Sequence, residues 1–390
     1  MALQHDLATL QEGRPPADPG LLARMTLGRE VWLDLFRRYQ LEAFLPGGGS
    51  KVKVLVGPGG SGKSHLLRCL GQDARDLGYA VVALSARDIG HRLGDLPALY
   101  RTIARNLDLA GLVDRLCLQV VSHLGYGSDY PGSGPLWPFL CDRGMPAEEA
   151  RRDIREAAAV LFRPADLAPA FATFAQRVVR ARLVQDSEEQ VRLLVGWLAG
   201  DKHDRAQKLR TGQFEVLRKP SARTWLTSLL GLLRLAGWKG LVVTVDDLEA
   251  MAERSPDTNR WAYTVAQAQD TLELLRQVID DAEVLTHFAL VLAGRETLIE
   301  DTRRGFKSYE ALWMRLQTGL VKLARFNSMA DLVDVAQLQH ELGADFPEQV
   351  ARRVTLLLDD LDVPRNSQAP RMPTDGWNLR DAVVAAATRF

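Results

Sequence analysis

The chain has 390 residues, 46% hydrophobic and 25% charged, which predicts a globular protein of two or three domains with a sizeable buried core. Its 49 basic and 49 acidic residues cancel, which excludes a strong attraction of the whole molecule to nucleic acid. No apolar run reaches the roughly 18 residues of a membrane span, and three cysteines without disulfide or zinc spacing predict a reduced, cytoplasmic protein.

The first 95 residues are predicted to contain a lead-in and the first part of an α/β core. Prolines at three positions before residue 20 predict a loosely held lead-in. β-branched runs predict strands, and leucines at helical spacing predict helices. Strand, glycine loop, helix and strand in this order are typical of a parallel βαβ unit. The predicted elements are a helix (30–43), a strand (51–56), a helix (63–77) and a strand (79–84).

The remainder of the chain is predicted to be a helical insertion, the second part of the core and a helical lid. Residues 96–238 have mostly helical periodicity, and the last 65 residues predict helices without any strand. The segments are thus 1–95, 96–238, 239–325 and 326–390. Later predicted elements are strands at 241–245 and 288–293 and helices at 270–279, 328–342, 347–358 and 377–390.

A glycine-rich loop after the first strand predicts a site for ATP and Mg²⁺. The segment Gly57-Pro58-Gly59-Gly60-Ser61-Gly62-Lys63-Ser64 fits the pattern G-x-x-x-x-G-K-[ST]. Glycines let the backbone N–H groups point inward at phosphates, and the following helix adds the positive end of its dipole. We expect Lys63 to contact the β- and γ-phosphates and Ser64 to ligate Mg²⁺. The predicted nucleotide-binding residues are Gly57, Gly59, Gly60, Ser61, Gly62, Lys63 and Ser64.

The strand at 241–245 ends in carboxylates that complete such a site. Asp246 is expected to hold Mg²⁺ through water. Asp247 stands where most ATPases of this kind place a glutamate that polarises the attacking water. Since aspartate is one methylene shorter, Glu249 is an alternative for this role. The sequence leaves the choice between the two open.

These motifs resemble AAA+ ATPases of the origin-recognition and initiator type, and more closely the BREX-system ATP-binding family of bacterial phage-defence loci. The resemblance covers roughly residues 20–390. Two departures are an Asp246-Asp247 pair in place of Asp-Glu and a gap of about 180 residues between glycine loop and acidic strand, longer than in a minimal ATPase domain. The stretches that carry the resemblance are Thr26–Glu30, Trp197–Asp201, Trp238–Gly240, Leu274–Asp280, Phe288–Gly294 and Tyr309–Leu316.

The resemblance implies roles for three arginines. Arg315 looks like the arginine presented to the γ-phosphate of a neighbouring subunit, which implies a homo-oligomer; an intramolecular salt bridge is its alternative. Arg380 matches the second-sensor position, where an arginine of the lid reaches the bound phosphates; an exposed first-turn arginine is its alternative. Arg295 lies where a first sensor falls, although the usual small polar residue is missing.

The implied function is that of an ATP-hydrolysing subunit of a phage-defence system, acting on DNA with a helicase or other protein partner. The best local candidate for DNA contact is the stretch 202–223, with seven basic and two acidic residues, although a solvated helix face explains it equally well. Two alternatives are an initiator-like DNA loader and a signalling or scaffold ATPase with very slow turnover, which the Asp247 substitution makes credible.

Overall fold

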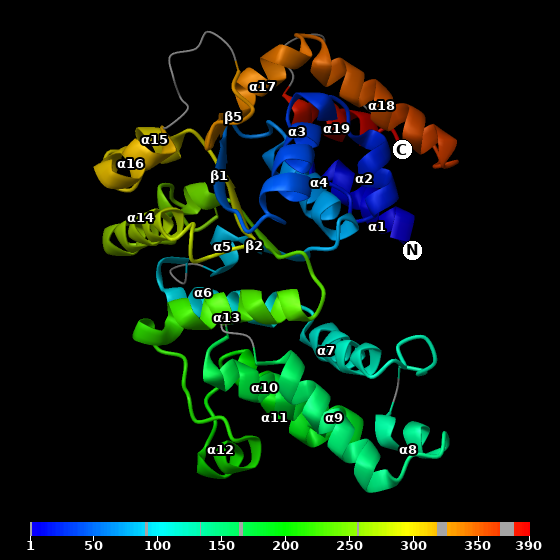
Figure 1. Ribbon diagram of the computed structural model, residues 1–390. Helices are drawn as coiled ribbons and strands as arrows, with labels where there is room; N and C mark the ends of the chain where they lie inside the picture. Colours follow the sequence, from blue (N-terminus) through cyan, green and yellow to red (C-terminus); the bar gives the residue numbers. More distant parts are fainter. Residues whose placement is uncertain are drawn as a thin grey trace.

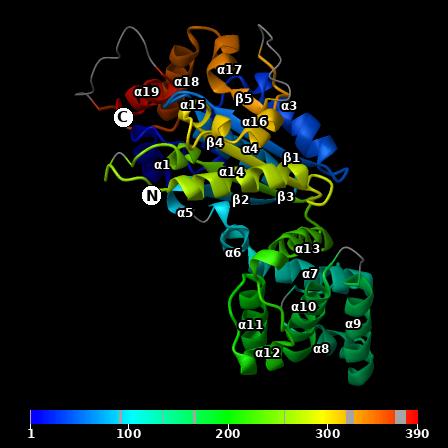
Figure 2. The ribbon, with the colours of Figure 1, turned by 90° about the vertical axis from the view of Figure 1, so that its left-hand side faces the viewer.

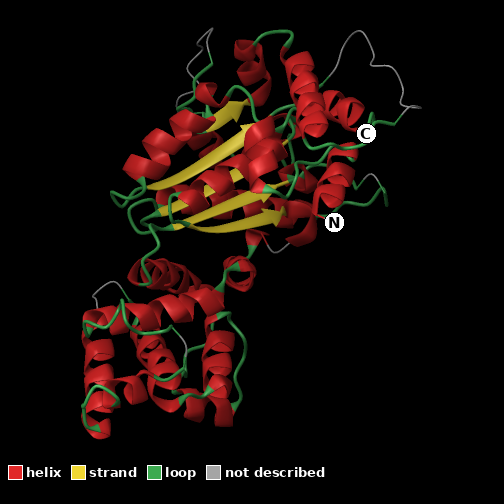
Figure 3. Ribbon diagram, turned by 90° about the vertical axis from the view of Figure 1, so that its right-hand side faces the viewer, coloured by secondary structure: helices red, strands yellow, loops and turns green. Residues whose placement is uncertain are grey.

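The computed structural model describes residues 2–89, 93–132, 134–163, 167–255, 257–317, 326–366 and 378–390. Within these residues, a parallel β-sheet has helices on both faces, and a second group of helices extends away from it (Figure 1, Figure 3). The predicted α/β class with a parallel sheet is therefore confirmed.

The strands are β1 (Ser50–Val56), β2 (Ala80–Ser85), β3 (Leu241–Asp246), β4 (Phe288–Gly294) and β5 (Leu332–Asp334). Their order is β2-β3-β4-β1-β5, and every neighbouring pair is parallel. Ser85 lies opposite Asp246, and Val56 lies opposite both Gly294 and Asp334. The carboxyl ends of the strands, and the residues that follow them, are therefore brought to one edge of the sheet.

Both faces of the sheet are buried, which explains why its strands are almost continuously apolar. In β4, Leu290 and Leu292 belong to one hydrophobic cluster, whereas Ala289, Val291 and Ala293 belong to another. The small alanines leave room for a helix to approach β4 closely. The second cluster is covered by α3 (Leu33–Phe36), η2 (Arg37–Phe44) and α4 (Lys63–Asp76), and the first by α6 (Leu96–Asn106), α14 (Val265–Asp280) and α16 (Glu310–Leu316).

Two predicted helices have different limits from those expected. The segment predicted as one helix over 30–43 is a 3₁₀ turn η1 (Arg29–Val31), then α3, then the π-helical η2. The buried residues Phe36 and Leu41 are five positions apart, a step that a widened turn accommodates. The helix predicted from residue 270 begins at Val265, because Thr264 and Gln267 form a capping box.

Lys53 is a buried cation in the centre of β1, with 1% of its surface exposed. Its Nζ donates to the carbonyl oxygens of Ser328 at 3.3 Å and Ala330 at 2.7 Å. Burial lowers the pKa of Lys53 to about 8. These hydrogen bonds tie β1 to the segment that enters β5.

The elements between β2 and β3 begin with α5 (Ala86–Ile89) and α6, which contact β2, and continue as the group of helices that extends from the sheet (Figure 2). Its core is aromatic: Trp197 and Trp225 are each 1% exposed, with ring centroids 4.7 Å apart, and Phe171 packs against both. The elements are α5, α6, α7 (Leu109–His123), α8 (Leu136–Cys141), α9 (Ala147–Leu161), α10 (Pro169–Arg180), η4 (Ala181–Gln185), α11 (Glu188–Leu198), α12 (Arg205–Thr211), η5 (Lys219–Ser221) and α13 (Ala222–Leu235).

The expected loose lead-in is wrong. Residues 2–25 form α1 (Ala2–Gln11) and α2 (Pro19–Met25), which pack against the C-terminal helices α18 (Phe346–Asp360) and α19 (Leu379–Ala387) in one cluster. Leu10 is 1% exposed there. The prolines mark the break between the two helices, and Asp18 caps the second one through the N–H of Leu21.

The prediction of no strand in the last 65 residues is also wrong, because β5 pairs with β1. The helix predicted over 328–342 is therefore shorter, α17 (Val335–Leu342), and Asp334 caps it. The helix predicted over 347–358 is confirmed as α18. The last predicted helix begins at Leu379, and its predicted first residue, Trp377, lies outside the described residues.

Candidate nucleotide-binding site

The glycine-rich loop connects the end of β1 to the start of α4, as predicted. Gly60 and Gly62 have φ of +79° and +84°, a conformation that other residues rarely adopt. A Cβ at Gly60 would lie 2.6 Å from the Oδ1 of Asn378, so α19 packs directly on the loop. Within the described residues, the N–H groups of Gly59, Gly60 and Gly62 have no hydrogen-bond acceptor. Backbone donors of this kind, at a helix N-terminus, bind anions.

Lys63 places a buried ammonium group at the mouth of this loop. Its Nζ donates to the carbonyl oxygens of Gly57 at 2.9 Å and Pro58 at 2.7 Å, and to the Oγ of Ser61 at 3.3 Å. Burial lowers the pKa of Lys63, and the carboxylates of Glu249 and Asp246 oppose that shift. The geometry thus holds a cation between the loop and two strand-end carboxylates.

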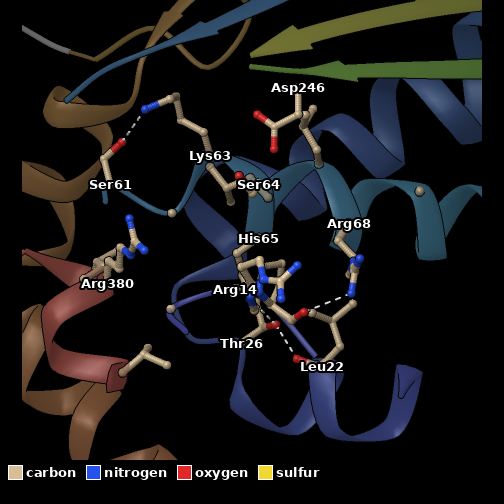
Figure 4. A pocket seen from close by; sticks show the side chains of 18 of the residues that line it. Arg14, Leu22, Thr26, Ser61, Lys63, Ser64, His65, Arg68, Asp246 and Arg380 are labelled. Carbon is tan, nitrogen blue, oxygen red and sulfur yellow. Dashed lines mark hydrogen bonds between the residues drawn. The ribbon is translucent and has the colours of Figure 1, made fainter. Parts of the chain in front are cut away.

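Ser64 and Asp246 lie beside each other, from α4 and the end of β3 (Figure 4). Burial raises the pKa of Asp246, and a hydrogen bond from the Ser64 hydroxyl opposes the increase. Mg²⁺ at nucleotide sites commonly takes one or two protein oxygens together with phosphates and water, so this pair fits the ion. No three His, Cys, Asp or Glu side chains of the described residues are grouped to hold a metal by themselves.

The two candidate catalytic carboxylates share one arginine. Asp247 adopts a left-handed conformation, with φ of +56°, and its Oδ2 accepts from the Ser85 hydroxyl at 2.8 Å. The Arg87 guanidinium lies 3.3 Å from Asp247 and 3.2 Å from Glu249. Glu249 is only 5% exposed, and burial raises its pKa. The sequence reasoning missed Ser85 and Arg87, although both follow a predicted strand whose carboxyl end meets that of β3.

Arg295 closes the other side of this carboxylate group. It follows β4, and its Nε lies 3.6 Å from Glu249 while its Nη1 lies 3.3 Å from Glu253. Glu253 also accepts from the Thr297 hydroxyl at 2.8 Å. The ends of β2, β3 and β4 therefore contribute one connected network of charges opposite the loop.

A cavity of about 990 Å³ extends from the glycine loop between α2, α4 and the C-terminal helices. Lys63, Ser64, Asp246, Asp247 and Glu249 line one end of it. Thr26, His65, Arg14 and Arg68 line the other end, as Figure 4 shows. The phosphate-binding features thus open into a space with its own polar and cationic side chains.

His65 is a polar group of the cavity wall. Its Nε2 lies 2.9 Å from the Thr26 hydroxyl, which donates to the Leu22 carbonyl oxygen at 2.6 Å. Burial lowers the pKa of His65 to about 4, and the nearby Arg29 and Arg68 add to this effect. The imidazole is therefore neutral at physiological pH.

This shift predicts an acid-sensitive stability. An unfolded chain protonates His65 near pH 6.5, whereas the folded protein does so only near 4, so its contribution is complete above 6.5 and declines toward pH 4. Between pH 7 and pH 5 the wild type should lose about 2 kcal/mol more unfolding free energy than His65→Gln. Urea unfolding of both proteins at the two pH values measures this difference, and equal losses would refute it.

The C-terminal helices also contact the loop. The Arg380 N–H donates to the Gly60 carbonyl oxygen at 3.0 Å, while its guanidinium donates to the Glu12 carbonyl oxygen at 3.0 Å. The Gln339 amide, from α17, donates to the Ser61 carbonyl oxygen at 2.8 Å. Arg380 therefore lines the cavity, with its guanidinium group on the N-terminal segment.

Arg315 lies away from this cavity wall, on α16. Its guanidinium pairs with the Asp280 carboxylate at 2.5 and 2.9 Å, and Arg276 also pairs with that carboxylate. The structure thus contains the intramolecular salt bridge that was its alternative. In the stretch 202–223, Arg210 pairs with Glu189 and Arg223 with Asp281.

The parallel sheet, the glycine loop and the strand-end carboxylates are together consistent with the P-loop class of nucleotide-binding α/β proteins. A family model described as "BREX system ATP-binding protein BrxC/D" matches residues 5–120 and 145–362. The chain belongs to this family of ATP-binding proteins of a phage-defence system. No curated protein and no solved structure gives a significant match.

None of the helices in the described ranges is both long and apolar enough to cross a lipid bilayer.

Proposed function

We propose that this protein hydrolyses ATP as an AAA+-type subunit of a BREX-like phage-defence assembly in the cytoplasm. The observation that supports the proposal best is the convergence of a buried lysine, a serine–aspartate pair and a buried glutamate at one end of the cavity. Phosphate, metal ion and attacking water need these three kinds of group.

In the proposed mechanism, the loop N–H groups and Lys63 bind the β- and γ-phosphates, and Ser64 and Asp246 hold Mg²⁺. The bound ion supplies charge neutralisation for the phosphates. Glu249 accepts the proton of the attacking water, with Asp247 as the other candidate. Arg87 and Arg295 orient the Glu249 carboxylate, since both contact it.

The C-terminal helices are proposed to act as a lid that senses the nucleotide. Arg380 and Gln339 hold the loop at Gly60 and Ser61, so a phosphate that alters the loop changes the position of α17 and α19. When ATP is bound, the Arg380 guanidinium is proposed to leave Glu12 for the phosphates. This movement would transmit the nucleotide state to a helicase or other partner acting on DNA.

Steady-state ATP hydrolysis by the purified protein, with and without duplex DNA, tests the proposed function. We expect turnover that depends on Lys63 and increases with DNA. Nucleotide binding without turnover would contradict the hydrolytic part of the proposal. It would favour a slow switch instead, a candidate supported by the arginine shared between Asp247 and Glu249.

Arg315 is proposed to leave Asp280 and contact the γ-phosphate bound by a neighbouring subunit. If it does, a mixture of Arg315→Ala and Lys63→Ala proteins should recover part of the activity that each lacks. The reason is that a subunit unable to bind ATP can still present its arginine to a neighbour. ATPase assays across mixing ratios measure the recovery. No recovery at any ratio would leave Arg315 with its salt bridge as its only role.

A further inference from the structure

An arginine–tryptophan cluster lies outside the nucleotide cavity, on two loops that follow β3 and β4. Trp261 is 39% exposed and forms an antiparallel β-bridge with Arg254. Between them, the N–H of Ser255 donates to the carbonyl oxygen of Arg260. The Arg254 guanidinium lies 5.3 Å from the centre of the indole ring. Arg304, from the loop after α15 (Thr297–Glu300), lies 3.6 Å from the same centre.

Several basic side chains of these loops form no ion pair within the described residues. Asp301 accepts the backbone N–H groups of Arg303 and Arg304, and Glu253 pairs with Arg295, so neither carboxylate is paired with a guanidinium of the cluster. In the stretch 202–223, by contrast, two arginines are paired with carboxylates. The basic residues without an ion pair among the described residues are Arg254, Arg260, Arg303, Arg304 and Lys307.

Stacking on an indole leaves the edge of a guanidinium free. A guanidinium that lies on an aromatic face keeps its N–H donors in the ring plane, where they match the oxygens of a phosphate. The Nε of Arg304 is buried, so the donors that can reach a phosphate on this side chain are those of its two Nη atoms. Trp261 therefore holds two guanidinium groups in place, and Arg254 spends one donor of its Nη1 on the Asn259 carbonyl oxygen at 3.3 Å.

The cluster is connected to the nucleotide site through one residue. Glu253 precedes Arg254, and its carboxylate accepts from Arg295 and Thr297, which stand at the end of β4 and the start of α15. Arg295 in turn contacts Glu249. A ligand that binds Arg254 and Arg304 therefore contacts both loops whose residues position the Glu249 carboxylate.

We propose that Arg254, Trp261 and Arg304 form a binding site for the phosphodiester backbone of DNA, and that its occupation accelerates ATP hydrolysis. The proposal rests on the proposed ATPase function and specifies the surface through which DNA acts. It favours this surface over the stretch 202–223.

Fluorescence anisotropy with a labelled 30-base-pair duplex and a labelled 30-nucleotide single strand tests the site. Arg254→Ala/Arg304→Ala should bind at least one of the two forms about tenfold more weakly. Its log–log salt slope should also be smaller by about two, one for each lost phosphate contact. Arg254→Gln/Arg304→Gln, which keeps part of each side-chain stem, replaces the alanine variant if that one does not fold.

A matched control removes equal charge from a similar setting. Arg151 also lies over an indole, 4.1 Å from the centre of the Trp137 ring, but it is paired with Glu148, and Arg152 is paired with Asp153. Arg151→Ala/Arg152→Ala should therefore bind DNA within about twofold of the wild type.

Equal affinity and salt slope in the Arg254/Arg304 variant and the wild type would overturn the proposal. So would a wild type that binds neither form of DNA, or one whose DNA is displaced equally well by polyglutamate, which carries charge without phosphate. ATP hydrolysis without DNA is measured in the same samples, and we expect the variant to retain it. If the wild type hydrolysed no ATP, the ATPase function itself would be refuted, independently of DNA binding.

Discussion

Lys63→Ala is expected to weaken ATP binding by two to three orders of magnitude. Charge-assisted hydrogen bonds are worth about 1.5–3 kcal/mol each, and a lysine that contacts two phosphates makes at least two of them. About 1.4 kcal/mol corresponds to a factor of ten in the dissociation constant. Isothermal titration calorimetry or a fluorescent ATP analogue measures the change. Binding of wild-type strength would show that the nucleotide lies elsewhere.

The chain offers a close control for this substitution. Lys53 is also a buried lysine whose ammonium is held by two backbone carbonyl groups, but it does not line the cavity. Lys53→Met removes the cation and keeps most of the stem. We expect it to leave ATP affinity within a few-fold of the wild type, so a large effect of Lys63→Ala alone would be specific to the loop.

Glu249→Gln is expected to lower kcat about a hundredfold or more, with the dissociation constant for ATP within a few-fold of the wild type. General-base catalysis typically contributes 10²- to 10⁴-fold, and glutamine keeps the shape of the side chain but cannot accept the proton. Glu249 is favoured because it is buried, lines the cavity and interacts with Lys63. Single-turnover hydrolysis separates the chemical step from product release.

Asp247→Asn is expected to lower kcat less than Glu249→Gln does, because the Asp247 side chain is 37% exposed and accepts from the Ser85 hydroxyl, whereas that of Glu249 is 6% exposed. Glu253→Gln is a matched control: it lies one turn beyond Glu249 and also pairs with Arg295, but it does not line the cavity. We expect a smaller effect from it. If Asp247→Asn gave the larger loss, the general base would be Asp247, and Glu249 would only position the arginines.

The glycine loop and four of the five strands could be predicted because their signals are local. The loop is defined by eight consecutive residues, and β1 to β4 are runs of β-branched and apolar residues between glycines or polar turns. β5 has only three residues, so its apolar pattern is too short to distinguish from the start of a helix. It exists because Val54 pairs with Leu332, nearly 280 positions away. Local hydrophobic periodicity cannot predict such a distant pairing.

The missed site residues have the same explanation. Ser85 and Arg87 meet the acidic strand end only because β2 lies beside β3 in the sheet. Strand order is decided by packing over the whole sheet, whereas the sequence specifies each strand separately. The parallel arrangement was nevertheless predictable, and it implies that residues after consecutive strands share one edge. Applied to the strand predicted at 79–84, this rule would have identified Ser85 and Arg87 as neighbours of Asp247.

The shared cluster of α1 and α2 with α18 and α19 has a consequence for how the chain matures during synthesis. Leu10, Leu21 and Met25 are made more than 300 residues before Phe346 and the later residues that cover them. At 5–20 residues per second, those apolar side chains wait for roughly 20 to 60 seconds. β1 waits similarly for β4 and β5, its two neighbours in the sheet. The helices between β2 and β3 have their partners close in sequence and can fold during this interval. Nascent chains of this protein are therefore expected to be substrates for chaperones until α18 and α19 emerge.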